Sequence, residues 1–150
     1  MDRTEQFRQH ISDGYTFKGD AIVLGTAMLD TVAVPHTQVK VPLKMLNRHG
    51  MISGATGTGK TKTLQVLCEQ VSAKGIPVLI MDIKGDVSGM AQPGNPHPKI
   101  DERMEKIGET WQPTAFPVEL LSISEEPGVR LRATVSEFGP VLFSKILDLN

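Results

Sequence analysis

The chain has 150 residues, with 16 Lys and Arg against 17 Asp and Glu, a formal net charge of -1 and a hydrophobic fraction of 39%. These values are typical of a globular domain and argue against a wholly disordered chain. The near-neutral charge gives no global attraction to nucleic acid or to anionic membranes. The single cysteine excludes an intrachain disulfide and a zinc site built from several cysteines. Without an 18-residue apolar run or an apolar leader, we expect no membrane span and a cytoplasmic location.

The first segment of the chain is predicted to be rich in β-structure. Residues 1–20 are polar and are expected to hold at most one short helix. The apolar run at residues 21–24 predicts a strand. Two further β-prone runs are broken by prolines and therefore predict edge strands; they are residues 31–34 and 39–43.

The middle of the chain has the pattern of a strand, a glycine loop, a helix and a second strand. A short run at residues 50–53 precedes the glycines, and residues 61–74 carry an apolar stripe at helical spacing. Gly75 is a plausible end of that helix. The wholly apolar run at residues 78–81 is suited to a buried parallel strand. Together these elements predict a βαβ unit.

The last third of the chain is predicted to mix loop, helix and strand. Residues 85–98 hold three glycines and three prolines and are expected to form a loop. Residues 99–109 are predicted to form a charged, exposed helix. The remaining predicted elements are strands at residues 117–123 and 129–135, and a helix at residues 139–149 with Pro140 in its first turn.

Residues 54–61 carry the strongest functional signal in the sequence. They read Gly-Ala-Thr-Gly-Thr-Gly-Lys-Thr, which matches the P-loop pattern G-x-x-x-x-G-K-[ST]. For a chain of this composition, the expected number of chance matches is roughly 0.01. The motif also follows an apolar run and opens a predicted helix, as a phosphate-binding loop requires.

The residue types of this motif suit a phosphate chain and its magnesium ion. Backbone N–H groups of a glycine-rich loop and of a helix N-terminus wrap the anion, and Gly57 and Gly59 permit the tight path. Lys60 is expected to reach the β- and γ-phosphates, and the Thr61 hydroxyl to bind Mg²⁺. The predicted nucleotide-binding residues are Gly54, Ala55, Thr56, Gly57, Thr58, Gly59, Lys60, Thr61 and Lys62.

Asp82 is the second candidate, because it ends the predicted strand at residues 78–81, where open α/β sheets place ligand-binding groups. It is expected either to hold Mg²⁺ or to position a nucleophile, which would make it catalytic with Lys60. Alternatively, it only caps the following loop or only binds the P-loop backbone. Cys68 is expected in the core, and Trp111 as a packing anchor rather than a platform for a base. Six polar residues are weaker candidates, because a solvated surface position or an exposed ion pair in a turn explains them at least as well. They are Arg48, His49, Lys84, Asp86, Arg130 and Arg132.

From about residue 38 the chain resembles the bacterial HerA-like ATPases, in the HerA/FtsK branch of P-loop NTPases. The P-loop alone specifies only the superfamily. Two further motifs restrict the resemblance from the superfamily to this family. They are Arg-His-Gly at residues 48–50, just before the P-loop, and the turn Asp-x-Lys-Gly-Asp-x-Ser-Gly at residues 82–89. Further matching residues are Asn47, Leu64, Gln65, the segment 132–136, Gly139, Pro140 and the segment 147–150.

The resemblance implies ATP as the nucleotide, a RecA-like parallel-sheet core and a homo-oligomeric ring. The better-understood relatives couple hydrolysis to movement along DNA, so DNA is a possible partner of the parent protein only. The usual Walker B acid and any arginine finger would lie beyond residue 150. We therefore expect the N-terminal portion of a longer protein, with a lead-in at residues 1–45 and part of a P-loop NTPase core at 46–150. Such a portion is expected to bind ATP but turn over little of it.

Two alternatives stay open. In a small P-loop kinase the strand that carries the metal carboxylate can neighbour the P-loop strand, and Asp82 would then bind the metal. In a non-catalytic regulatory module, nucleotide binding would order the loop at residues 85–98 and present it to a partner. An intervening strand between the runs 50–53 and 78–81 would favour the RecA-like core, and direct adjacency would favour the kinase.

Overall fold

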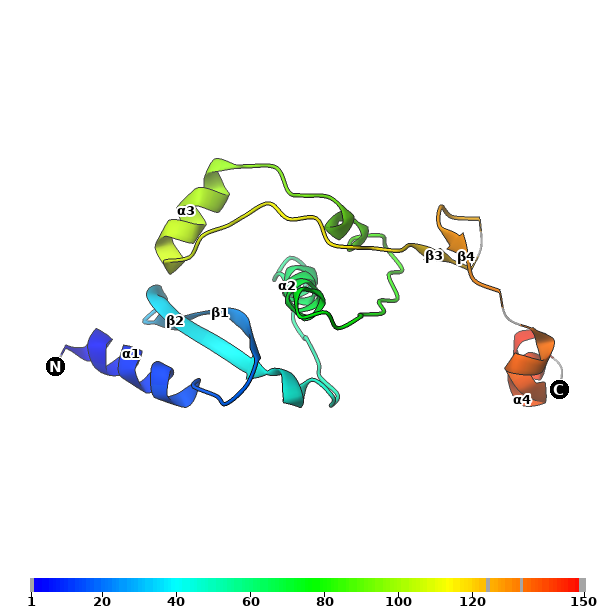
Figure 1. Ribbon diagram of the computed structural model, residues 1–150, viewed down its shortest axis with the longest axis horizontal. Coiled ribbons are helices and arrows are strands. Elements are labelled where there is room, and N and C mark those ends of the chain that lie inside the picture. The colour runs from blue at the N-terminus through cyan, green and yellow to red at the C-terminus, as the bar shows by residue number, and fades with distance from the viewer. Residues whose placement is uncertain (1, 124, 133, 149–150) are drawn as a thin grey trace. The chain divides into compact units, whose positions relative to one another are not determined.

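The computed structural model describes residues 2–123, 125–132 and 134–148 (Figure 1). The chain forms an α/β structure with two compact units, Met1–Phe116 and Pro117–Asn150. Among the described residues no helix is both long and apolar enough to cross a membrane. The first unit contains the elements α1 (Arg3–Gly14), β1 (Ala21–Leu29), β2 (Val32–Pro42), η1 (Leu43–Met45), α2 (Lys60–Ala73), η2 (Ser88–Ala91) and α3 (Pro98–Ile107).

β1 and β2 form an antiparallel hairpin, which confirms the β-rich start of the chain. Asp30 and Thr31 connect the strands with positive φ angles of 48° and 67°, as a two-residue hairpin turn requires. The two predicted edge strands are one continuous strand, β2. Pro35 is tolerated there because the pairing shifts register between Thr26 and Met28, and this irregularity removes the need for a donor at that position.

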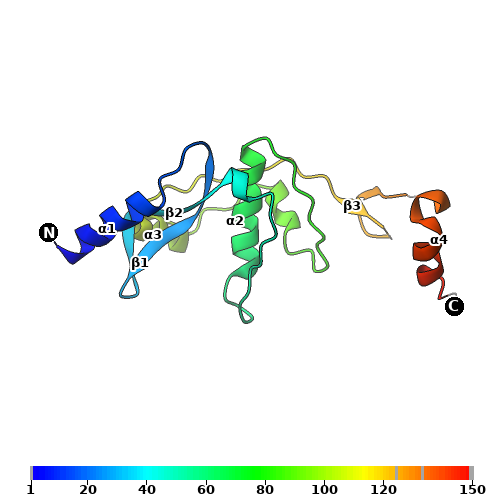
Figure 2. The ribbon, with the colours of Figure 1, turned by 90° about the horizontal axis from the view of Figure 1, so that it is seen from below.

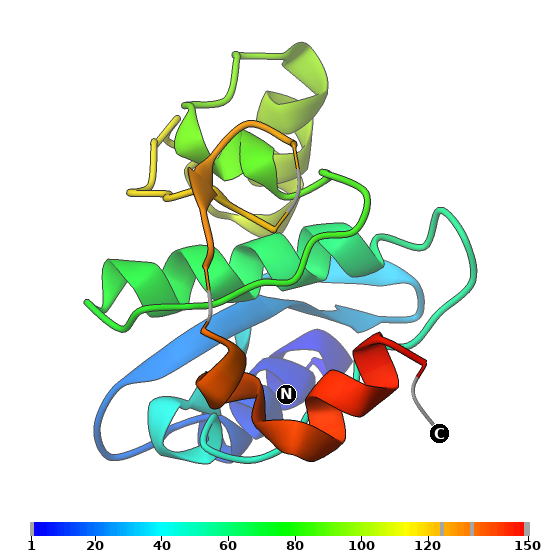
Figure 3. The same cartoon turned by 90° about the vertical axis from the view of Figure 1, so that its right-hand side faces the viewer.

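Three helices pack on the hairpin, and one of them, α2, contributes buried residues to the small core of the first unit. α1 and α3 contact β2, and α2 contacts β1; the hairpin runs between α1 and α2 (Figure 3). The buried apolar residues of the hairpin and α2 include Ile22, Val34, Cys68 and Val71. The predicted core position of Cys68 is therefore confirmed.

The side chain of Gln70 fixes α2 to the edge of β1. Its Oε1 accepts a hydrogen bond from the Val23 N–H at 2.6 Å, and its Nε2 donates to the Val23 carbonyl at 2.5 Å. One amide therefore satisfies both backbone groups of Val23, as a neighbouring strand would. This contact holds the helix that begins at the predicted phosphate-binding loop.

The predicted helices at residues 61–74 and 99–109 are confirmed within a few residues as α2 and α3. The His97 side chain accepts the Lys99 N–H at the start of α3, and Gly108 ends that helix with a positive φ of 70°. A side chain at Gly108 would force its neighbours to move, because a Cβ there would lie 2.8 Å from His36 Cε1 and 3.0 Å from Pro35 Cβ. The close approach lets the end of α3 rest on β2, where Glu109 bonds Gln38.

The predicted βαβ unit is wrong in its strands. Neither residues 50–53 nor residues 78–81 form a strand. A buried parallel strand is hydrogen-bonded to neighbouring strands and shielded from solvent on both faces. Among the described residues, no strand pairs with either of these runs. Their large apolar side chains are consequently exposed, Met51 by 88% and Met81 by 93%. The parallel sheet of a RecA-like core is therefore not confirmed. Because neither run is a strand, strand order does not distinguish a RecA-like core from a kinase.

The second unit contains β3 (Leu121–Ser122), β4 (Val129–Arg130) and α4 (Val135–Ile146). β3 and β4 pair in parallel, so the two strands predicted here exist but shrink to two residues each. Ala133 of the second predicted strand lies outside the described residues. The segment that connects the two strands passes close to the Leu120 backbone at Gly128. A Cβ at Gly128 would lie 2.6 Å from the Leu120 carbonyl oxygen.

α4 begins earlier than predicted because Glu137 caps its first turn. The Glu137 carboxylate accepts the Thr134 N–H at 2.7 Å and the Thr134 hydroxyl at 3.0 Å. Gly139, with φ 65° and ψ 163°, interrupts the helix. Pro140 then starts its second segment, which is the position expected for a proline at a helix start. Residue 149, the predicted end, lies outside the described residues.

Candidate functional site

The predicted phosphate-binding residues form an exposed loop that leads directly into α2. Figure 2 shows this loop and α2 side-on. Gly57 and Gly59 have positive φ angles of 79° and 91°, conformations that only glycine adopts at no steric cost. Gly59 is the residue before the first turn of α2. The two glycines therefore have the conformational role that the sequence assigns to them.

The loop closes around the carbonyl oxygen of Ala55. This oxygen accepts the Thr58 hydroxyl at 2.8 Å and the Lys60 Nζ at 2.7 Å. A Cβ at Gly54 would lie 2.5 Å from Thr58 Oγ1, so a larger residue there would displace the Thr58 side chain from this arrangement. The ammonium group of Lys60 is thus folded back over the loop that precedes it.

The first turn of α2 offers free backbone donors. Its first intrahelical bond runs from the Thr63 N–H to the Gly59 carbonyl at 2.9 Å. The N–H groups of Lys60, Thr61 and Lys62 therefore have no intrahelical acceptor. No acidic side chain lies in this first turn, and the helix dipole adds positive potential. The arrangement suits an anion with several oxygens, and the exposed Thr61 hydroxyl is a ligand that Mg²⁺ accepts.

Asp82 anchors the loop that follows residues 78–81. Its Oδ1 accepts the N–H groups of Lys84 at 3.2 Å and Gly85 at 2.9 Å, and its Oδ2 accepts the Val87 N–H at 2.9 Å. The Val87 bond is the largest cause that lowers the pKa of Asp82. This geometry is the loop-capping alternative of the sequence analysis. A carboxylate has about four acceptor sites, so a metal or nucleotide role of Asp82 stays a prediction.

Gln65 joins the Asp82 loop to the helix of the P-loop. Its Nε2 donates to the Asp86 carbonyl oxygen at 3.0 Å, and Val87 is buried with 7% of its surface exposed. Sequence reasoning quoted Gln65 only as part of a resemblance and gave it no role. A bond between a side chain and a distant backbone carbonyl leaves no local pattern that would have revealed it.

Of the weaker candidates, Lys84 and Asp86 lie in the loop that Asp82 anchors. Arg48, His49, Lys84 and Asp86 are exposed, as are Arg130 and Arg132 of the second unit. Within the described residues no ion pair joins Lys84 to Asp86, and no group of three His, Cys, Asp or Glu side chains is placed to hold a metal ion. Burial, with a smaller effect of Glu69, raises the pKa of the Cys68 thiol.

A cavity of about 500 Å³ lies along α2, and Lys62 is the one predicted nucleotide-binding residue among the described residues that line it. Sequence reasoning did not find it, because its walls come from separate parts of the first unit. Its lining includes Lys62, Gln65, Glu69, Gln92, Trp111 and Gln112. Burial raises the pKa of the Glu69 carboxyl, and the charge of Lys62 partly offsets this effect.

Residues 28–150 match the model of a protein family described as helicase HerA-like, C-terminal. Comparison with curated proteins and with solved structures finds no significant match. The match supports the resemblance that the motifs carry. It does not confirm that the chain is the N-terminal portion of a longer protein, because the matching family model is a C-terminal one.

Proposed function

This chain belongs to the HerA-like family, and we propose that it forms the Mg·ATP-binding part of an ATPase of that family. The observation that supports the proposal most strongly is the loop at residues 54–59. It carries positive-φ glycines at two positions and leads into the free donors of a helix N-terminus. Few structural roles require such a loop to be directly followed by a lysine and a threonine.

The phosphates would be held by residues 54–62. The N–H groups of Lys60, Thr61 and Lys62 would donate to phosphate oxygens. The Lys60 ammonium would leave the Ala55 carbonyl, which it contacts at 2.7 Å, and turn to the β- and γ-phosphates. Bound Mg²⁺ would neutralise phosphate charge, with the Thr61 hydroxyl as one ligand. Asp82 would act near the metal or only keep its loop in place.

In the parent protein, hydrolysis would be coupled to DNA movement by a homo-oligomeric ring in the cytoplasm. This wider activity follows from the family resemblance and forms part of the same proposal. The chain described here supplies the nucleotide contact.

Binding of Mg·ATP to Lys60→Ala tests the proposal. Isothermal titration calorimetry should detect binding by the wild-type chain and a loss of at least about tenfold in the variant, because charge-assisted hydrogen bonds to the phosphates disappear. Lys18→Ala is the matched control, since Lys18 is an exposed lysine outside the loop, and it should bind normally. Wild-type affinity in Lys60→Ala, with its fold intact by circular dichroism, would contradict the P-loop assignment.

A further inference from the structure

The cavity beside α2 shares one residue, Lys62, with the predicted nucleotide-binding residues. Lys62, Gln65 and Glu69 line it, and their spacing places them on one face of α2. Lys62 lies in the first turn, two residues after Lys60. Lys62 thus belongs both to the first turn of α2, whose N–H groups are predicted to hold phosphates, and to the lining of the cavity. The volume of about 500 Å³ is in the range of small-molecule sites.

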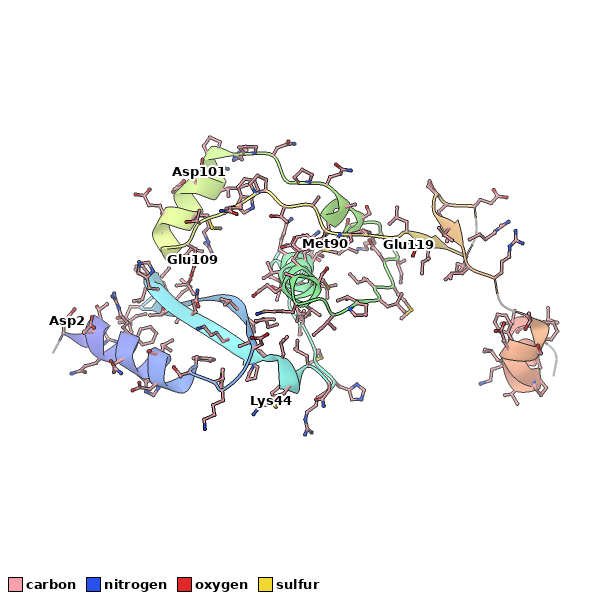
Figure 4. All side chains as sticks on the ribbon, viewed as in Figure 1. Asp2, Lys44, Met90, Asp101, Glu109 and Glu119 are labelled. Carbon is pink, nitrogen blue, oxygen red and sulfur yellow. The ribbon has the colours of Figure 1, made fainter. Side chains whose placement is uncertain are left out.

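The lining of the cavity also includes an aromatic ring, that of Trp111. Trp111 is half-buried and lines the cavity with Met90; Figure 4 labels Met90 beside α2. Gly94 lies against the indole so closely that a Cβ there would be 3.0 Å from Trp111 Cζ2. The hydrogen bond from the Phe116 N–H to the Met90 carbonyl, at 3.0 Å, holds the Trp111 segment against η2. Aromatic side chains held in this way stack on nucleobases.

Side-chain amides supply polar groups to the same lining. Gln92, Asn95 and Gln112 line the cavity, and within the part of the chain that the structure describes no hydrogen bond engages their side-chain amides. An amide presents a donor beside an acceptor, and this pair matches the N6 and N7 groups of adenine. Trp111 and the amides thus combine stacking with recognition of a base edge.

We propose that this cavity takes the adenine base and ribose of the nucleotide whose phosphates bind at residues 54–62, with Trp111 stacked on the base. The inference rests on the proposed function and adds the residues that recognise the nucleoside. It replaces our expectation that Trp111 is only a packing anchor.

Trp111 is the only tryptophan of the chain, so its fluorescence reports on this cavity directly. Titration of the wild-type chain with Mg·ATP should change the emission, whereas Mg·tripolyphosphate, which has phosphates but no base, should bind without doing so. ATP should also bind more tightly than tripolyphosphate. Equal affinities, with no change in Trp111 emission by ATP, would overturn the inference.

Variants separate the base from the phosphates. Trp111→Ala should weaken ATP binding by about tenfold, the effect of losing one stacked base, and leave tripolyphosphate binding unchanged. Trp111→Phe should restore most of the loss. If Trp111→Ala does not fold, Gln112→Ala keeps the indole and should show the same selective loss. Phe17→Ala removes an aromatic ring outside the cavity and should affect neither ligand.

The outcomes distinguish the two proposals. If Lys60→Ala abolishes binding of both ligands but no cavity variant alters ATP affinity, the P-loop assignment stands and the nucleoside site is wrong. If the wild-type chain binds neither ATP nor tripolyphosphate, the proposed function itself fails. A selective loss of ATP in both Trp111→Ala and Gln112→Ala supports the nucleoside site.

Discussion

Replacing Gln70 by Met should loosen α2 from the hairpin. The variant keeps a long, flexible side chain with good helix propensity, and it removes the two hydrogen bonds to Val23, at 2.6 Å and 2.5 Å. A hydrogen bond of this kind contributes about 0.5–1.5 kcal/mol to stability. Val23 is half-buried, so water can partly replace the amide. We therefore expect a loss of about 1–2 kcal/mol in the free energy of unfolding.

Urea unfolding followed by circular dichroism measures this loss. The midpoint should fall while the slope with denaturant stays the same, since the surface exposed on unfolding hardly changes. Gln6→Met is the matched control, because Gln6 lies on an exposed position of α1, and it should shift stability by less than about 0.5 kcal/mol. A Gln70→Met midpoint equal to that of the wild type would refute the idea that this amide fixes α2.

The remaining predictions concern Gly108 and Glu137. Gly108→Ala should lower the free energy of unfolding in urea by about 2–4 kcal/mol. The alanine would be strained in the left-handed backbone conformation, and its Cβ would also lie too close to His36 and Pro35. Gly75→Ala has the strain without the contacts and should cost about 1 kcal/mol, and equal losses in the two variants would refute the packing argument. The pKa of Glu137 is lowered chiefly by the Thr134 N–H, so its cap is present above the ordinary glutamate pKa and is lost as the pH falls through the lowered value. NMR should show the Thr134 amide shifting in that acidic range in the wild type but not in Glu137→Gln, and an identical titration in both would contradict the cap.

The sequence predicts best those features that depend on neighbouring residues. The apolar stripe of α2 and the glycines before it define a loop and a helix without help from the rest of the chain. The β-prone runs of the hairpin are predictable for the same reason, although neither their pairing nor the shift in register at Pro35 is. The glycine loop and the helix that follows it are therefore foreseen, while phosphate binding by this loop stays a prediction.

Features that depend on distant partners could not be foreseen. The apolar run at residues 78–81 indicates what the segment could bury, but it does not say whether neighbouring strands are available. The bonds of Gln65 to Asp86 and of Gln70 to Val23 join positions 21 and 47 residues apart. The cavity wall with Trp111 likewise comes from several segments, so no spacing rule reveals it.

The amide of Gln70 has a consequence for how the chain behaves at high concentration. The outer edge of a β-hairpin can recruit a strand from another molecule and so begin aggregation. Because Gln70 occupies both backbone groups of Val23, it closes part of that edge to intermolecular pairing. The residue that positions the helix thus also prevents another strand from pairing at Val23.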